Sequence, residues 1–392
     1  MSVLSYRRVV LEAVAYTLPR EIVSSAELEC RLTPLYERLR LPEGRLELMT
    51  GIRERRFFPA GLVGEISART VQRLLHVTGI DPAWIGSLVH ASVCRDFMEP
   101  ATACGVHHAA GLPDDCVVYD LSNACLGQLN AVVQIADGIE LGRLRAGIVV
   151  GTENARDLVE STVRHLNGDQ SLTRRSVKDA VASLTIGSAS TAILLVEESL
   201  SCGWHGSENN GMDETNPETG EEWGVVRGGW RLRGGVIQTD TRGCTLCRGD
   251  HQLISGNTDG DDGTACGGTL MWTDSTGLLE SGVTLGAAAF ETFPAAAGWT
   301  RGMIDRTICH QVGQAHTQRL FEAIGLDPTI DRSTFEFLGN TGSAALPVTL
   351  ALAAAGRAMP VNATPIGPVD RVALLGIGSG VNTLMLGLEG ER

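Results

Sequence analysis

The sequence predicts an α/β fold in which largely parallel, buried sheets are covered by helices on both faces. Two observations lead to this expectation. Strand-like and helix-like segments alternate along most of the chain, and this alternation is typical of parallel sheets whose strands are joined by helices. The 392 residues are 43% hydrophobic and 20% charged, which is enough apolar material for two domains or for one large α/β unit with a deep core.

In the first part of the chain the expected elements follow one another at short intervals. Strands are expected at residues 6–19, 85–94, 116–124, 146–154 and 188–198, and helices at 24–39, 64–80, 101–112 and 126–141. Ser24 and Glu27 have the spacing of a capping box, and Gly79 marks the end of the second helix. The helix at 126–141 is amphipathic, and its apolar face comprises Leu126, Leu129, Val132, Val133, Ala136 and Ile139.

The later part of the chain repeats this alternation without a clear internal sequence repeat. Helices are expected at 281–299, 315–326 and 345–356, a strand at 306–312, and a closing pair of strands at 371–388. Pro347 lies in the first turn of the helix at 345–356, and Gly356 follows its end. Residues 203–231 and 249–277 are rich in Gly, Asn, Asp, Thr and Glu, so we expect them to be loop insertions at the surface.

Charge and apolar runs exclude several classes of protein. The net charge of −14 argues against binding of nucleic acid or an anionic membrane, although a local basic patch still allows a small anionic substrate. The start of the sequence lacks the apolar core and cleavage site of a secretion signal. No uninterrupted apolar run reaches the roughly 18 residues of a membrane span. We therefore expect a cytosolic protein whose ten cysteines are reduced thiols.

Cys125 lies at the junction between the strand at 116–124 and the helix at 126–141. The first backbone N–H groups of a helix have no partners within it and carry partial positive charge, which lowers the pKa of a thiol there. A tight strand-to-helix turn also points the side chain out of the sheet, as in nucleophile elbows. The alternative is an inert, buried cysteine, and position alone leaves both interpretations open.

Two further side chains lie where apolar strands or helices meet loops, as partners of a nucleophilic cysteine do. His310 directly follows the strand in "RTICHQVGQAH", and Asn340 lies between glycines in "FEFLGNTGSAALP". Either residue alone is more typical of a structural position or a simple turn. A cysteine nucleophile, however, needs a base or an orienting group, and these two residues are candidates.

Taken together, these segments resemble the thiolase superfamily, on the ketoacyl synthase III branch. The motifs are "TGIRERRF" at 50–57, "DLSNACLG" around Cys125, "CHQVGQAH" around His310, "GNTGSAALP" around Asn340 and "LLGIGSGVN" near the end. The resemblance implies a five-layer αβαβα fold with mixed, mostly parallel sheets. It also implies two duplicated halves, here residues 1–200 with the cysteine and 201–392 with the histidine and asparagine, in a homodimer.

The resemblance also implies the chemistry of these residues. Cys125 would accept the acyl group of a thioester, and the backbone N–H groups of Cys125 and Ser379 would form the oxyanion hole. His310 and Asn340 would then hydrogen-bond the carbonyl of a second acyl thioester and stabilise its enolate. Oxyanion donors fit this reaction because losing one costs about 3–4 kcal/mol of barrier in well-studied enzymes.

The segment "SVCRDFMEPATA" further resembles the olefin-pathway thiolases (OleA type), which join two fatty acyl-CoAs head to head without decarboxylation. That resemblance implies that Glu99 is the base and that it reaches into the partner subunit's site. A plain acyl-CoA must lose a weakly acidic α-proton, whereas malonyl decarboxylation generates its own carbanion. Met49 and Ala315 also depart from the malonyl-dependent synthases, which carry arginines there. The alternative interpretations are a solvent-facing Glu99 and a decarboxylating 3-oxoacyl synthase that uses malonyl carrier protein.

Other constellations predict different functions. Cys202 and His205, with Cys244 and Cys247, have spacings that would suit a zinc site, and "CTLC" alone would suit a redox motif. We favour neither and expect no metal and no cofactor besides the acyl-CoA or acyl-carrier-protein substrates. Three basic residues, Arg53, Arg55 and Arg56, are candidates for contacts with CoA phosphates or for ordinary surface charge. A non-catalytic subunit of the same fold is disfavoured because the cysteine, histidine and asparagine are all present.

Overall fold

The computed structural model describes residues 1–202, 211–250, 270–310, 313–357 and 364–390. Its main sheet has the strand order β13-β14-β15-β10-β2-β8-β7-β5-β6. The bounds, in this order, are Arg306–Cys309, Arg371–Gly378, Asn382–Glu389, Glu222–Thr239, Val9–Leu18, Ala189–Glu197, Ala146–Glu153, Ile85–Ala91 and Val117–Leu121. Two further strands, β1 (Ser2–Ser5) and β9 (Gly211–Thr215), also pair with β10 but lie outside this strand order.

The two halves of this sheet repeat one pairing pattern, which confirms the duplication. In the N-terminal half β5 is parallel to β6 and β7, and β8 is antiparallel to both β7 and β2. In the C-terminal half β13 is parallel to β14, and β15 is antiparallel to both β14 and β10. A parallel bridge between Thr307 and Asp331 lies where the pairing of β5 with β6 lies in the first half. The expectation of mostly parallel sheets is wrong for the described strands of the main sheet, where three strand pairs are parallel and the others are antiparallel.

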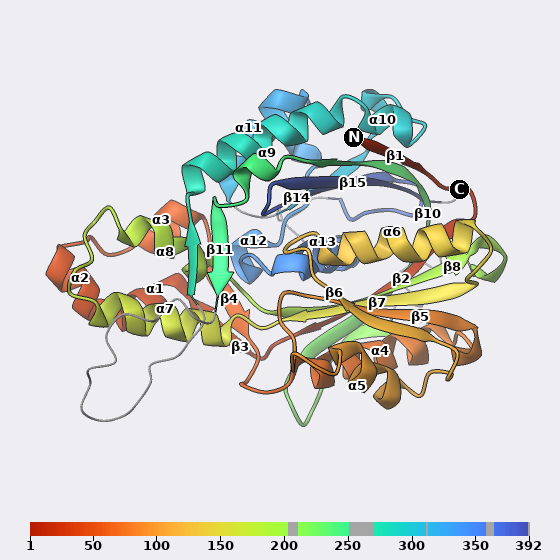
Figure 1. Cartoon of the computed structure of the whole chain (residues 1–392), viewed down its shortest axis with the longest axis horizontal. Helices are drawn as coiled ribbons and strands as arrows, with labels where there is room; N and C mark the ends of the chain where they lie inside the picture. The colour runs from red at the N-terminus through yellow and green to blue at the C-terminus, as the bar shows by residue number, and fades with distance from the viewer. Residues whose placement is uncertain (203–210, 251–269, 311–312, 358–363, 391–392) are drawn as a thin grey trace.

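Helices cover and separate the two halves of the sheet to give the five layers visible in Figure 1. Helices α6 (Gly127–Glu140) and α13 (Ala345–Ala354) form the central layer between them. The outer face of the N-terminal half is covered by α4 (Val63–Thr78) and α5 (Thr102–Ala110). The outer face of the C-terminal half is covered by α9 (Ser275–Phe290), α10 (Phe293–Ala296) and α11 (Gln314–Ile324). Because α13 is enclosed on all sides, its residues are buried all round, which matches its uniformly apolar sequence.

A smaller helical unit lies at one end of the layers, around a separate apolar cluster. Its elements are β3 (Glu21–Ser24), α1 (Ser25–Arg31), α2 (Thr33–Leu39), α3 (Arg45–Thr50), β4 (Glu54–Phe57), α7 (Arg156–Gly168), α8 (Val177–Val181), β11 (Cys247–Asp250), β12 (Leu270–Thr273) and α12 (Phe335–Leu338). The capping box of Ser24 and Glu27 is confirmed. The single helix expected at 24–39 is two helices, because Pro34 starts a new first turn after Leu32.

The expectation of a loop insertion at 203–231 is wrong for residues 211–215 and 222–231, which lie in strands β9 and β10. Strand β10 pairs with β2 on one side and with β15 on the other. Its glycines made the sequence look like a loop, but they serve close packing. A Cβ on Gly224 would come within 2.7 Å of the Tyr16 hydroxyl oxygen, and the register shifts between Arg227 and Trp230.

Of the insertion expected at 249–277, residues 251–269 lie outside the described residues, while β12 and the start of α9 account for most of the rest. Helix α9 begins six residues before the expected start at 281, with Asp274 as its N-cap, and a break before Pro294 separates it from α10. Among the described helices, none is long and apolar enough to cross a membrane.

Candidate active site

Several strands of both halves end at a shared edge, and the candidate residues follow these ends. Cys125 follows β6, His310 follows β13 and Ser379 follows β14. The segment with Glu99 follows β5. In α/β sheets, ligands bind beyond the carboxyl ends of the strands, so the topology places these residues where a site is expected.

Cys125 lies on a sharp turn between β6 and α6. Ala124, directly before it, has φ of 45°, a left-handed conformation that non-glycine residues rarely adopt. Such strain at the residue before a candidate nucleophile is typical of functional turns. Leu126 forms the N-cap of α6 and packs closely against Gly378 at the end of β14. A Cβ added to Gly378 would lie 3.7 Å from the Leu126 backbone nitrogen. The elbow predicted from the sequence is therefore present, next to the turn that carries Ser379.

The expected lowering of the Cys125 pKa is wrong. Burial raises the pKa of this thiol to about 12, and the nearby Cys247 thiol and Glu153 carboxylate raise it further. A hydrogen bond from backbone at Cys125 acts in the opposite direction but is the smaller effect. Removing a charged sulfur from water thus outweighs the partial positive charge at the start of α6.

This sign gives a testable pH dependence. In the unliganded protein the thiolate of Cys125 becomes populated only as the pH approaches its raised pKa, so alkylation by iodoacetamide should be slow at neutral pH. The rate should keep rising about tenfold per pH unit from pH 7 to 10, measured by mass spectrometry of the proteolytic peptide that contains Cys125. Glutathione, an exposed thiol with a pKa of about 8.5–9, serves as the reference, and its alkylation rate should level off at a lower pH than that of Cys125. A plateau of the Cys125 rate already near pH 7 would contradict the raised pKa.

His310 is buried at the end of β13, where its backbone N–H donates to the Leu375 carbonyl at 3.0 Å. Neither ring nitrogen has a hydrogen-bond partner among the described residues. Burial, followed by the neighbouring His316, lowers the pKa of His310 to about 3, so the ring is neutral at physiological pH. Since buried polar atoms are normally paired, these nitrogens are available to a bound substrate.

Asn340 begins the turn that leads into α13, as Cys125 begins α6 in the other half. Its backbone N–H donates to Thr185 O at 2.9 Å, and its Oδ1 accepts from the Gly342 N–H at 3.0 Å. The amide oxygen is thus used within the turn, which leaves the Nδ2 group as the donor for a substrate carbonyl. Gly127, at the start of α6, packs against Ser343 of the same turn.

Three residues near the site, Asn382, Glu153 and Ser343, were not identified from the sequence. Asn382 donates from Nδ2 to Ser379 O at 3.1 Å and lies 3.5 Å from Asn123 Oδ1, so it connects the Ser379 turn to the Cys125 elbow. Glu153 is a buried carboxylate at the end of β7, and Ser343 lies 2.6 Å from it. A charged residue ending an otherwise apolar strand in "GIVVGTEN" was the available clue for Glu153.

Glu99 differs from Cys125, His310 and Asn340 in its exposure to solvent in the single chain. It is exposed, with no hydrogen bond or ion pair to any described residue. Its neighbours Phe97 and Met98 are also exposed, at 54% and 98%. The segment 92–100 therefore presents a carboxylate and two large apolar side chains on the surface of the single chain.

The arginines considered for CoA phosphates have other roles. Arg55 is fully buried and donates to Ser25 Oγ at 3.1 Å, and Arg56 pairs with Glu222 at 2.9 Å. These two are structural, while Arg53 is exposed and pairs with Glu336. For the zinc alternative, His205 lies outside the described residues, and among those described no group of three candidate ligands comes together.

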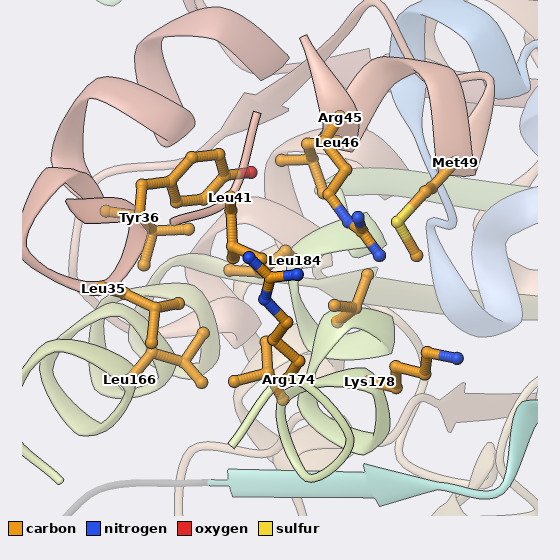
Figure 2. A pocket seen from close by; sticks show the side chains of 13 residues that line it. Leu35, Tyr36, Leu41, Arg45, Leu46, Met49, Leu166, Arg174, Lys178 and Leu184 are labelled. Atoms are coloured by element: carbon orange, nitrogen blue, oxygen red, sulfur yellow. The ribbon is translucent and has the colours of Figure 1, made fainter. Parts of the chain in front are cut away.

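A small open pocket, with a cavity volume of about 30 Å³, lies in the helical unit, between α2 and α3 on one side and α7 and α8 on the other (Figure 2). Its walls are mostly apolar, and Figure 2 shows the guanidinium groups of Arg45 and Arg174 facing the same space. Leu184 forms part of the wall and directly precedes Thr185, the residue that accepts from the Asn340 N–H. An apolar pocket with cations suits an anionic, partly apolar ligand.

Comparison with known proteins gives consistent matches. Residues 49–224 match the model of the thiolase N-terminal domain, and residues 295–386 match that of the 3-oxoacyl-[acyl-carrier-protein] synthase III C terminal domain. The chain is 36% identical to an acyl-CoA:acyl-CoA alkyltransferase of Shewanella oneidensis, over 98% of this chain and all of that protein. A β-ketoacyl-[acyl-carrier-protein] synthase III of Sphingopyxis alaskensis is 34% identical, but over only 38% of this chain and 44% of that protein.

A solved structure resembles the whole chain. It is a cysteine-to-serine variant of Xanthomonas campestris OleA with bound lauric acid and lauroyl-CoA. The TM-score is 0.79 at 27% identity, and the match covers 98% of this chain and 99% of that one.

Proposed function

Because the chain belongs to the acyl-CoA:acyl-CoA alkyltransferase family of the thiolase superfamily, we propose that it condenses two fatty acyl thioesters head to head, without decarboxylation. The observation that carries this proposal is the full-length match to that family, whereas the match to a malonyl-dependent synthase covers little more than a third of the chain. The elbow at Cys125, with the unpaired His310 ring and the Asn340 turn, supports the same reaction.

The first step is acyl transfer to Cys125. The sulfur attacks the thioester carbonyl, the carbonyl oxygen becomes an oxyanion, and the backbone N–H groups of Cys125 and Ser379 stabilise it. The C–S bond to CoA then breaks, and CoA leaves as a thiol that carries the proton lost by Cys125. The high pKa of Cys125 keeps the sulfur protonated in the free enzyme, so the proton leaves the sulfur as its bond to the acyl carbon forms.

In the second step a carbanion attacks the acyl-cysteine. Glu99 of a second subunit removes the α-proton of another acyl-CoA, and Nδ2 of Asn340 and the neutral ring of His310 hydrogen-bond the resulting enolate oxygen. The new C–C bond forms at the acyl carbon, and the Cys125 thiolate leaves. The product is a 2-alkyl-3-ketoacyl-CoA, which retains the CoA of the second substrate.

A homodimer completes this site. The exposed Phe97 and Met98 beside Glu99 support it, because two large apolar side chains at the tip of one segment are typical of a surface covered by a partner. A second copy of the chain would bury these side chains and bring the Glu99 carboxylate into a drier environment, beside the substrate whose α-proton it removes.

Arg45, which lines the pocket of Figure 2, is our candidate for a contact with the phosphates of CoA. If Arg45 contacts the nucleotide phosphates, Arg45→Glu should raise KM for an acyl-CoA about threefold to tenfold with little change in kcat. Steady-state kinetics should show no such change with the N-acetylcysteamine thioester of the same acyl group, which lacks phosphates. Arg53→Glu, a surface arginine paired with Glu336, is the matched control. An equal change of KM for both thioesters would place the phosphates elsewhere.

The reaction itself is tested by product analysis of the purified enzyme. With a long-chain acyl-CoA alone, the product should be the 2-alkyl-3-ketoacyl-CoA or the ketone formed when it is hydrolysed and loses CO2. With acyl-CoA plus malonyl carrier protein, no additional product should appear. Product formed only from the second mixture would instead establish the decarboxylating synthase.

A further inference from the structure

Glu153 is a buried carboxylate whose role the two reaction steps leave open. It is the last residue of β7 and is only 5% exposed. A single oxygen, Oε1, lies 3.1 Å from the Val93 backbone nitrogen, 3.3 Å from the Ser343 backbone nitrogen and 2.6 Å from Ser343 Oγ. Among the described residues no arginine, lysine or histidine forms an ion pair with it. Its stabilisation therefore comes from hydrogen-bond donors, as a buried carboxylate without a counter-ion requires.

The donors to Glu153 belong to two segments that carry proposed functional groups. Val93 lies at the start of the segment that ends with Glu99, and Ser343 lies in the turn that starts with Asn340. These segments come from different halves of the chain. The turn packs directly on the carboxylate, because a Cβ on Gly342 would lie 3.2 Å from Glu153 Oε1, and Gly342 has φ of 56°. One oxygen atom thus connects the Asn340 turn to the Glu99 segment.

We propose that Glu153 is a positioning residue for condensation, which acts by accepting hydrogen bonds from the Asn340 turn and from the segment that carries Glu99. This inference rests on the proposed function. The geometry of Asn340 and Glu99 matters only when the enolate forms and attacks, whereas acylation of Cys125 uses the elbow and the Ser379 turn. Displacing a positioning group by about 1 Å can lower a rate by roughly 100-fold. Loss of the Glu153 oxygen should therefore impair the second step selectively.

The test compares Glu153→Ala and Glu153→Gln by two rates: acyl-adduct formation on Cys125, by intact-protein mass spectrometry, and condensation, by product analysis. Glu153→Ala should lower condensation at least tenfold and acylation less than about threefold. Because all three donors approach one oxygen, the amide oxygen of Glu153→Gln can replace it, so this variant should retain condensation within about threefold. Ser343→Ala, which removes one donor, should shift the ratio of the two rates in the same direction by a smaller factor.

The experiment also distinguishes a role of the Glu153 negative charge from the proposed role through hydrogen bonds. Since Glu153 contributes to the raised pKa of Cys125, Glu153→Gln should shift the pH profile of iodoacetamide alkylation to lower pH even where condensation is retained. Condensation lost equally in Glu153→Gln and Glu153→Ala would mean that the charge is required and would overturn the proposal. Equal loss of both rates in Glu153→Ala, or loss of neither, would overturn it as well.

Controls separate these outcomes from general destabilisation and from failure of the proposed function. Glu12 is a similarly buried carboxylate on β2, 2.8 Å from Ser201 Oγ, so Glu12→Ala should lower Tm without changing the ratio of the rates. If Glu153→Ala does not fold, an unchanged ratio in Ser343→Ala overturns the proposal. A wild-type enzyme that forms the acyl adduct but no condensation product would refute the proposed function instead.

Discussion

Cys125→Ala is expected to abolish both acyl transfer and condensation, with a loss of about 10⁴-fold or more. No other group in the proposed sequence of steps accepts the acyl chain, and removal of a nucleophile in comparable covalent enzymes leaves only the small residual rate due to binding and oxyanion donors. The expected observation is the absence of an acyl adduct after incubation with a long-chain acyl-CoA, while Tm stays close to that of the wild type.

The control for this prediction is the neighbouring thiol. Cys247 lies near enough to Cys125 to affect its pKa, and its own sulfur is 3.4 Å from Thr273 Oγ1. Cys247→Ala should still form the adduct, and peptide mapping should place it on Cys125. An adduct that persists in Cys125→Ala and disappears in Cys247→Ala would transfer the role of nucleophile to Cys247.

Much of the fold could be predicted because its strands are buried on both faces. Runs such as those of β7 and β8 are largely apolar and almost fully buried, so both appear as strands in the sequence. Helices α7 and α8, which lie between them and begin without a side-chain cap, were not predicted. Strand β10 was missed because its close contacts require glycine, which in a sequence alone indicates a loop. The direction of β8 was missed because an alternation of elements does not specify which pairs are antiparallel.

The candidate site likewise has features that could be predicted from the sequence and features that could not. Cys125, His310 and Asn340 could be proposed as site residues because they lie at the ends of apolar elements within distinctive motifs, and the structure places each after such an element. The sign of the Cys125 pKa shift was wrong because burial of the sulfur, the largest cause, and the charge of Glu153 both arise from the tertiary fold. Asn382 and Ser343 were missed for the same reason, since their importance comes from contacts between the two halves.

Glu99→Ala is expected to abolish condensation, with a loss of about 100-fold or more, and to leave acylation of Cys125 intact. General base catalysis typically contributes 10²–10⁴-fold, and the first step needs no carboxylate. Because Glu99 is exposed in the single chain, its removal should not lower Tm. The measurement is a single-turnover experiment in which the acyl-enzyme forms at the wild-type rate and then persists without product. Condensation at the wild-type rate would show that Glu99 is not the base.

A mixed dimer tests whether Glu99 acts across the subunit interface. Cys125→Ala and Glu99→Ala chains, each inactive alone, are co-expressed with different affinity tags and purified as a heterodimer. In that dimer one site combines the intact Cys125 of the Glu99→Ala chain with the intact Glu99 of its partner, so about half of the wild-type activity per dimer should return. The other site lacks both groups. If Glu99 acted within its own chain, neither site would hold both residues and the heterodimer would stay inactive, as would happen if the segment 92–100 were merely a solvent-exposed loop.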